Sequence, residues 1–228
     1  AVKGGTRGGW GLGTRKKGSW TRVRHARRFG ITVLLLWSSA ALAQERGSAA
    51  LGQLVDGLGV SARVLLVAAH PDDEDTALLA WLVHRQHADA AYLSLTRGDG
   101  GENLIGDELG EALGVIRTEE LLAARRLDGA TQYFTRAYDF GFSKSADETY
   151  THWPKDSVLR DVVTVMRAFR PHIVVAVFSG TPRNRHGPHQ VSGILPREAY
   201  DAPADTVRFP RSVTAGHGAW TPSKLYLG

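Results

Sequence analysis

The chain has 228 residues, of which 43% are hydrophobic, enough for one folded domain with a sizeable buried core. It has no cysteine, which excludes a fold stabilised by disulfides. Its formal charge of +5 arises near the N-terminus, because residues 1–43 contain nine Lys and Arg residues and no acid. Removing these nine from the total of 28 leaves 19 basic against 23 acidic residues, a formal charge of −4 that gives no reason to expect a nucleic-acid partner.

The first 43 residues have the composition of a targeting segment. Residues 1–21 are rich in glycine and basic residues, and we expect them to be disordered or an over-extension of the true start. Residues 22–43 follow the order of a signal peptide: four arginines, a short apolar run at 31–42, and the small-residue site Ala41-Leu42-Ala43. An uncleaved membrane anchor is the alternative, but the run is short for a bilayer span. We therefore expect an exported, periplasmic or extracellular protein whose domain covers residues 44–228, without a stable membrane span after cleavage.

A run of β-forming residues at 63–67 leads, through two alanines, into the polar cluster His70-Pro71-Asp72-Asp73-Glu74. Such a run is typical of a buried strand in a parallel sheet, and open α/β sheets bind their ligands at the carboxyl ends of such strands. Because neighbouring carboxylates repel each other, the cluster favours a bound cation that offsets the repulsion. The alternative is that the acidic residues only cap the helix that follows.

Strands and helices alternate through the rest of the chain. Apolar periodicity predicts helices at residues 74–86, 108–127 and 156–169, and a further helix that ends near residue 200 and is kinked at Pro196. Strands are predicted at residues 90–95, 132–135 and 173–178, and another begins at 224–228, where we expect a longer protein to continue. Residues 138–153 lack periodicity and are interpreted as a loop lining a cleft. The alternation predicts an α/β fold, a three-layer Rossmann-like domain with a mostly parallel sheet.

A second polar loop, residues 184–190, follows the predicted strand at 173–178 and carries His186 and His189. Two histidine-bearing loops that each follow a buried parallel strand can converge at one edge of the sheet. Nitrogen and oxygen ligands from such loops suit zinc, and three protein ligands leave one position for water. The spacing of His70, Asp72 and His189 also fits the iron site of non-haem oxygenases, although those enzymes usually have antiparallel barrels.

These two motifs together resemble a known family. The His-Pro-Asp-Asp-Glu box at 70–74, combined with the distal His-x-x-His at 186–189, is similar to the LmbE-like or PIG-L-like zinc-dependent N-acetylglucosaminyl de-N-acetylases. The resemblance covers roughly residues 63–202, most of the chain after its N-terminal extension. It implies the LmbE-like version of the α/β fold and a zinc cofactor, with another divalent metal such as Fe2+ as the alternative.

The resemblance also implies a role for each residue of the two motifs. His70, Asp73 and His189 match the family's metal ligands. Asp72 matches its general base, and His186 matches the histidine that lies near the reacting carbonyl.

Two further residues are implied to contact the substrate. Arg117 matches a family arginine that reaches the substrate, and its alternative role is a surface ion pair with Glu119 or Glu120. Asp99 lies in the glycine-rich turn 96–101, where the family usually has the longer glutamate. Pro188 is a second departure, because the family often has aspartate directly before the last histidine. Both departures fall on supporting positions and bear on substrate choice more than on the metal ligands.

The sequence therefore predicts a metal-dependent hydrolase that removes the N-acetyl group from an amino sugar or glycoconjugate. Zinc lowers the pKa of a bound water toward about 7, a carboxylate can accept the remaining proton and pass it to the leaving amine, and the metal with a protonated histidine can stabilise the oxyanion. A non-haem iron oxygenase and a non-catalytic sugar-binding module are the alternatives. The presence of Asp72 argues against the latter, because a binding module needs no base.

The leader generates a first testable prediction. We expect cleavage after Ala43 on export, because the basic segment, the apolar run and the Ala-Leu-Ala site occur in the order that signal peptidase recognises. N-terminal sequencing of the exported protein should give Gln44 as the first residue. A mature chain that retains residues 31–36 would instead identify an anchored protein.

Overall fold

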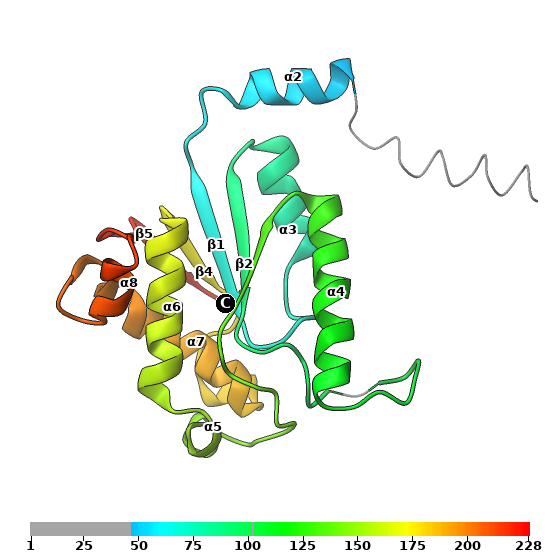
Figure 1. The fold of residues 1–228 in the computed structure, drawn as a ribbon, viewed down its shortest axis with the longest axis vertical. Coiled ribbons are helices and arrows are strands. Elements are labelled where there is room, and N and C mark those ends of the chain that lie inside the picture. Colours follow the sequence, from blue (N-terminus) through cyan, green and yellow to red (C-terminus); the bar gives the residue numbers. More distant parts are fainter. Residues whose placement is uncertain (1–46, 102) are drawn as a thin grey trace, which may run out of the picture. The chain divides into compact units, whose positions relative to one another are not determined.

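Five parallel strands form one sheet in the order β3-β2-β1-β4-β5 (Figure 1). The computed structural model describes residues 47–101 and 103–228, so the predicted signal peptide lies outside the described residues. Residues 52–228 form one compact unit, which contains the whole sheet. The strands are β1 (Arg63–Ala68), β2 (Asp89–Ser94), β3 (Thr131–Phe134), β4 (Ile173–Ala176) and β5 (Lys224–Leu227).

Helices cover both faces of the sheet and complete the three layers that the sequence predicted. On one face lie α3 (Thr76–Ala80), which continues as the π-helical turn η1 (Trp81–Arg85), and α4 (Glu111–Asp128). On the other face lie α6 (Lys155–Phe169) and α7 (Gly187–Ala199). The other elements are α2 (Ser48–Gly57), α5 (Ala146–His152), η2 (Pro182–Asn184), η3 (Ala202–Ala204) and α8 (Pro210–Thr214).

The hydrophobic core has two parts because residues of a strand point alternately to opposite faces of the sheet. Leu65 and Val67 of β1 pack into the part that includes α6 and α7. Val64 and Leu66 pack into the part that includes α3 and α4. β1 is therefore buried on both sides, which explains why its sequence is continuously apolar.

The strand order reverses between β1 and β4. β2 and β3 extend the sheet on one side of β1, whereas β4 and β5 extend it on the other. Connections that leave β1 and β4 therefore diverge at their carboxyl ends, and this switch point is where open α/β sheets hold ligands. Both histidine motifs follow these two strands. The wholly parallel sheet is also unlike the antiparallel barrel expected of the iron oxygenase alternative.

The predicted loop at 138–153 is wrong in part, because it contains helix α5. Ser145 caps this helix by accepting a hydrogen bond from the backbone N–H of Glu148 at 3.2 Å. The Glu148 carboxylate in turn accepts one from the backbone N–H of Lys144 at 2.7 Å. A serine followed three residues later by glutamate is a helix-start signal, so the sequence did contain the information.

The second polar segment is also more helical than expected. His186 is the N-cap of α7, so His189 lies in the first turn of a helix and not in a loop. Pro188 fits there because proline is tolerated in the first turn, where its missing N–H would have no helical partner. Similarly, α3 begins at Thr76, two residues later than predicted, because Asp75 accepts a hydrogen bond from the backbone N–H of Leu78 at 2.9 Å.

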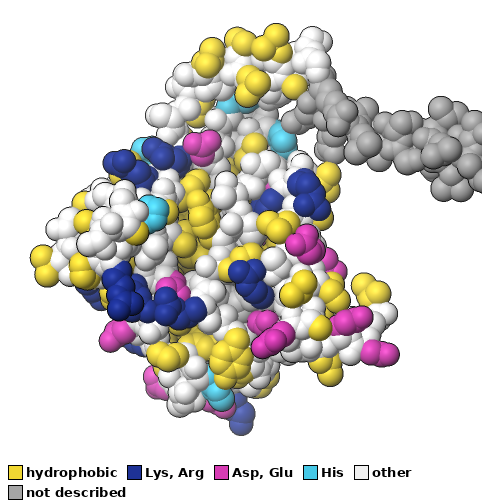
Figure 2. All heavy atoms as spheres, viewed as in Figure 1, with side chains coloured by type: hydrophobic (Ala, Val, Ile, Leu, Met, Phe, Trp, Pro, Cys, Tyr) yellow, Lys and Arg dark blue, Asp and Glu magenta, His cyan; other side chains and the backbone are white. Residues whose placement is uncertain are grey.

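The surface mixes side chains of different kinds. Figure 2 shows basic, acidic and apolar side chains interspersed on the face viewed in Figure 1. Leu104, Ile105 and Leu109, in the connection before α4, are largely exposed. Among the described residues, no helix combines the length and apolar character needed to span a bilayer.

A buried arginine ties the segment after α7 to the domain. The Arg167 side chain, on α6, is 1% exposed, and none of its hydrogen-bond partners within residues 47–101 and 103–228 is a carboxylate. It donates to the Ser212 hydroxyl and to the backbone carbonyls of Ala202, Pro203, Asp205, Arg208 and Phe209. A buried donor with this many acceptors fixes a segment that contains little regular structure of its own.

Arg167→Met should destabilise the protein by at least ~2 kcal/mol, because several buried carbonyls lose their donor. The matched control is Arg136→Met, since Arg136 is exposed and bonds only to Asp161 among the contacts of its side chain. Its loss should cost less than about 1 kcal/mol. Urea unfolding of both variants measures the difference, and equal losses would contradict the structural role of Arg167.

Candidate active site

A cavity of about 560 Å³ lies at the carboxyl ends of β1 and β4. Six of the seven predicted site residues line it: His70, Asp72, Asp73, Arg117, His186 and His189. The motif at 70–74 reaches it from the end of β1, and the histidines at 186 and 189 reach it from the start of α7. The fold therefore brings together two motifs that are more than 100 residues apart in the sequence.

Asp73 connects the two motifs. Its Oδ2 accepts hydrogen bonds from the backbone N–H groups of Ala69 at 3.2 Å and His70 at 2.8 Å, and it lies 3.2 Å from Nδ1 of His70. Its Oδ1 lies 3.3 Å from Nε2 of His189. Burial opposes ionisation, but the hydrogen bonds with His189 and His70 outweigh it and hold the pKa of Asp73 well below its usual value. Asp73 is therefore a carboxylate at neutral pH.

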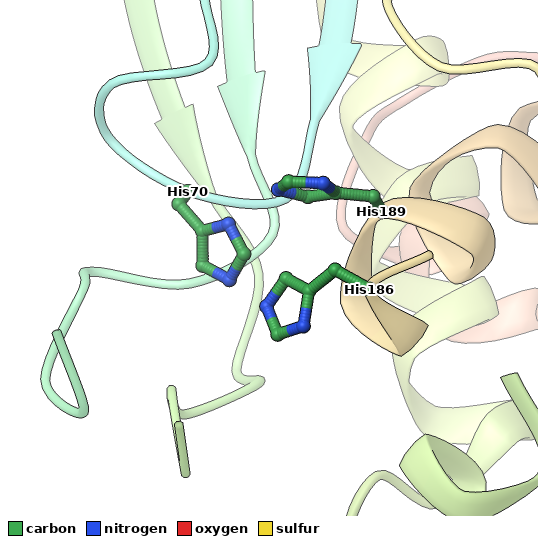
Figure 3. A group of neighbouring side chains, drawn as sticks. All are labelled: His70, His186 and His189. Atoms are coloured by element: carbon green, nitrogen blue, oxygen red, sulfur yellow. The ribbon is translucent and has the colours of Figure 1, made fainter. Parts of the chain in front are cut away.

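Three imidazole rings face one another at the cavity (Figure 3). The ring centroid of His70 lies 5.1 Å from that of His186 and 5.1 Å from that of His189. The centroids of His186 and His189 are 4.7 Å apart. One nitrogen of each ring lies within 4.8 Å of the others. His70, Asp72 and Asp73 form a second group with the same property. The predicted ligands His70, Asp73 and His189 combine members of these two groups. His70 belongs to both groups, and Asp73 of one group contacts His189 of the other at 3.3 Å.

The residues around the rings set their protonation. Burial lowers the pKa of His70, but its hydrogen bond to Asp73 and the charge of Asp73 outweigh burial, so the net shift is upward. Burial and the neighbouring His70 and His189 lower the pKa of His186. Protonated His186, which the predicted oxyanion role requires, is therefore disfavoured in the free protein.

Asp73 lies close to an imidazole of each motif, and this donor set can be compared with that of a metal site. Ligands held about 2.0–2.1 Å from one zinc ion at tetrahedral angles lie roughly 3.3–3.4 Å from each other. Asp73 lies at about that separation from both imidazoles, but through different oxygens, with Oδ2 at 3.2 Å from His70 and Oδ1 at 3.3 Å from His189. Two imidazole nitrogens and a carboxylate oxygen are also a donor set that divalent zinc accepts.

Close packing orients the histidines of α7. The Phe178 ring stacks on His189, with centroids 4.0 Å apart and planes within 9°. The backbone N–H of Gly187 donates to the carbonyl of Ser143 at 2.9 Å. A Cβ at Gly187 would lie only 2.3 Å from atoms of Ser143 and of α5. Only glycine therefore allows α7 to begin this close to Ser143 and α5. The Ser143 carbonyl also lies 3.4 Å from Nδ1 of His186.

Arg117 binds Asp72 and not the two glutamates considered as its alternative partners. Its Nη2 donates to Oδ2 of Asp72 at 2.9 Å, and the side chains are 17% and 68% exposed, respectively. The glycine-rich turn packs against this arginine: a Cβ at Gly98 would lie 2.8 Å from its Cδ, and one at Gly101 would lie 2.4 Å from its Nη1. The turn therefore approaches a side chain of the protein itself, and its glycines make room for it.

Asp99 is the one predicted site residue that the structure places outside the cavity. It lines a separate depression against α4, and its Oδ1 would lie 2.1 Å from a Cβ added to Gly114. Its Oδ2 lies 3.4 Å from the backbone N–H of Asp139. Direct contact of Asp99 with the substrate is thus a prediction that its position does not favour. Instead Asp99 supports the loop that carries Asp139.

The loop after β3 supplies cavity residues that the sequence reasoning missed, namely Asp139, Gly141 and Phe142. Asp139 is buried, and its Oδ1 accepts a hydrogen bond from the N–H of Gly141 at 2.9 Å. Phe142 is 69% exposed and stacks on His186, with planes within 9°. The only local signal was the aromatic, glycine-containing stretch itself, which was assigned to the cleft without individual roles.

The sequence model for GlcNAc-PI de-N-acetylase (PIG-L) matches residues 65–200, more than half of the chain. The chain belongs to the PIG-L family. Among its relatives, the 1D-myo-inositol 2-acetamido-2-deoxy-alpha-D-glucopyranoside deacetylase of Rhodococcus opacus is 32% identical over 72% of this chain and 60% of its own length. The deacetylase of the same name from Geodermatophilus obscurus is 31% identical over 73% of this chain, again covering 60% of the relative. The chain thus spans about 60% of the length of these relatives.

Two solved structures share the fold. The N,N'-diacetylchitobiose deacetylase of Pyrococcus horikoshii aligns with a TM-score of 0.56 and 20% identity, over 72% of this chain and 59% of that one. The 4-carboxy-2-hydroxymuconate hydratase GalB of Pseudomonas putida aligns with a TM-score of 0.55 and 21% identity, over 73% and 65%. Because a deacetylase and a hydratase share this fold, the reaction of this PIG-L family member has to be argued from its site.

Two glycines of the turn at residues 96–101 allow a comparison between a clash with backbone atoms and a clash with a flexible side chain. Gly100→Ala should destabilise the protein by ~1–3 kcal/mol, because the new Cβ would lie 2.5 Å from the Asp139 carbonyl and the Gly141 nitrogen, which are backbone atoms. Gly101→Ala should cost less, because its obstacle is the end of the flexible Arg117 side chain. Urea unfolding of both variants tests this order, and the reverse order would contradict the packing described.

Proposed function

We propose that this PIG-L family protein is a zinc-dependent de-N-acetylase that acts on an N-acetylglucosamine-type sugar conjugate. The observation that carries the proposal is the carboxylate of Asp73 held between His70 and His189, with a second carboxylate, Asp72, facing the same cavity. The adjacent residues Asp72 and Asp73 have different partners, so Asp73 can serve as a metal ligand and Asp72 as a base. Family membership supports the same chemistry.

The metal is assigned to His70, Asp73 and His189. Zinc bound there would supply a water of lowered pKa and a Lewis acid for the amide carbonyl. Asp73 suits this role because it is ionised and its Oδ2 is fixed by two backbone N–H groups. His186 lies close enough to compete as a ligand, and a metal-content measurement separates the two assignments.

The proton transfers are assigned to Asp72. This carboxylate is the most exposed of the cavity's acids described above and lies beside the ligands, so it can accept a proton from the attacking water and return it to the leaving amine. Arg117 holds one of its oxygens at 2.9 Å and leaves the other to interact with water. We assign His186 the role of contacting the reacting carbonyl. Negative charge that develops on this oxygen favours the protonated form of His186, which its surroundings disfavour in the free protein.

The substrate class is inferred from the relatives, whose names specify acetamido-glucopyranosides. The exposed face of Phe142 at the cavity suits an apolar face of a sugar ring. We further propose that the enzyme is exported and acts outside the cytoplasm, on the strength of the basic, apolar and small-residue pattern at 22–43.

The function is tested by an assay for free amine and acetate against a panel of N-acetylated amino sugars and their conjugates. The metal-stripped protein should be inactive, and added zinc should restore activity. A protein that binds zinc but releases no acetate from any N-acetylated sugar would refute the proposal. Turnover of an N-acetylated amino acid, with none of a sugar, would assign a different substrate class.

Asp72→Asn should lower turnover by about 10²–10⁴-fold at saturating zinc, because asparagine cannot accept the proton from water. Its zinc content should match that of the wild type. The matched control is Asp75→Asn, which changes a nearby acid that caps α3. Asp75→Asn should keep most of the activity, and unchanged activity of Asp72→Asn would rule out Asp72 as the base.

His189→Ala and Asp73→Ala should sharply reduce the zinc content of the purified protein, whereas His186→Ala should largely keep it. The reason is that the first two variants each remove one of three assigned ligands. Elemental analysis after dialysis measures the content, and circular dichroism checks the fold. Loss of zinc from His186→Ala with retention in Asp73→Ala would assign the metal to the three histidines instead.

A further inference from the structure

A buried cluster of charged and polar side chains lies beside the turn that carries His70 and Asp73. We call it the Arg125 cluster, and its members are Glu74, Tyr92, Arg125, Asp128 and Gln132. Arg125 of α4 donates twice to Asp128 from Nε, at 3.0 and 3.1 Å, and once from Nη2, at 2.6 Å. It also donates to Gln132 at 3.1 Å and to Oε1 of Glu74 at 3.3 Å. The Glu74, Arg125 and Asp128 side chains are all less than 10% exposed.

The cluster holds the turn at both of its ends. At one end, the hydroxyl of Tyr92 donates to the backbone carbonyl of His70 at 2.5 Å. At the other end, Glu74, the residue directly after Asp73, is held by Arg125. The two ends are linked, because the Arg125 guanidinium lies 5.7 Å from the centroid of the Tyr92 ring. Contacts with α4 and β2 therefore fix the backbone positions of His70 and Asp73.

Burying the charged groups of the Arg125 cluster costs free energy that stability alone does not explain. Taking charged groups out of water costs several kcal/mol for each ion, and apolar residues of similar volume often stabilise a core at least as well. Moreover, Oε2 of Glu74 is buried and has no hydrogen-bond partner among the described residues. A group that is buried with an unsatisfied oxygen calls for an explanation, and its attachment to the predicted metal-binding turn offers one.

We propose that Glu74 and Arg125 are positioning residues that set the orientation of His70 and Asp73 for metal binding. The proposal rests on the metal site assigned above and adds residues that touch neither the metal donors nor the cavity. Partners that orient metal ligands typically account for 10- to 100-fold in affinity. Breaking the Glu74–Arg125 contact should therefore weaken zinc binding beyond any loss of stability.

The chain provides a matched control for this distinction. Arg167 is also a nearly fully buried arginine with many hydrogen bonds, but it lies on the opposite face of the sheet and binds the segment 202–212. A purely structural role of Arg125 would make the two arginines equivalent, with both affecting unfolding and neither affecting the zinc affinity of the folded protein.

The experiment measures zinc affinity by competition with a chromogenic chelator, and stability by thermal unfolding of the metal-free chain. Glu74→Ala and Arg125→Met should bind zinc about 10- to 100-fold more weakly than the wild type. Glu74→Gln keeps an oxygen that can accept from Arg125 and should lie closer to the wild type than Glu74→Ala does. Arg167→Met should unfold at a lower temperature but bind zinc as the wild type does.

The outcomes separate the two proposals. If the wild type binds zinc and folded Glu74→Ala binds it equally tightly, the positioning role is overturned and the metal site stands. If the wild type binds no zinc, the metal site is overturned, and the positioning role with it. Should Arg125→Met fail to fold, Glu74→Ala and Glu74→Gln decide the question by themselves, because both leave the contacts of Arg125 with Asp128 and Gln132 in place.

Discussion

The carboxylate of Asp73 connects the segment that follows β1 with the segment that follows β4. One oxygen is held by backbone N–H groups at the end of β1, and the other contacts His189, which enters from the connection after β4. The strand order reverses between these two strands, so their connections diverge and leave a cavity at the carboxyl edge of the sheet. The ionisation of Asp73 and the link between His70 and His189 depend on this bridge.

Much of this arrangement could be predicted from the sequence, because it depends on local patterns. Continuous apolar runs identified β1 and β4 as buried strands, and alternation with amphipathic helices gave the three layers. The polar residues that directly follow those strands had to lie at one edge of a parallel sheet. The two histidine-bearing segments were therefore expected to converge, the family resemblance singled out His70, Asp73 and His189 among them, and in the structure Asp73 contacts both histidines.

What the sequence did not give are contacts made by long side chains across the fold. Nothing in the pattern of α4 distinguishes Arg117, which reaches Asp72, from Arg125, which reaches Glu74, or indicates that Arg167 would be buried without a carboxylate. Asp99 was assigned to the substrate because it stands where the resembling family usually has glutamate, whereas the turn directs it toward α4. Helix α5 was missed for a different reason: the Ser145 and Glu148 cap signal was present, but the short helix lacks a clear apolar face.

The pairing of β1 with β4 has a consequence for how the site comes into being. Leu65 pairs with Val174, and the segment between them contains the strands β2 and β3 and the helices α3, α4, α5 and α6. Contacts between residues so far apart in sequence form slowly, because the intervening chain must first give up its freedom. The first histidine motif is translated long before the second, yet the donors of the two motifs can meet only after β4 has docked beside β1. A nascent chain or fragment that ends before residue 173 therefore carries the first motif without the second and without the geometry that joins them.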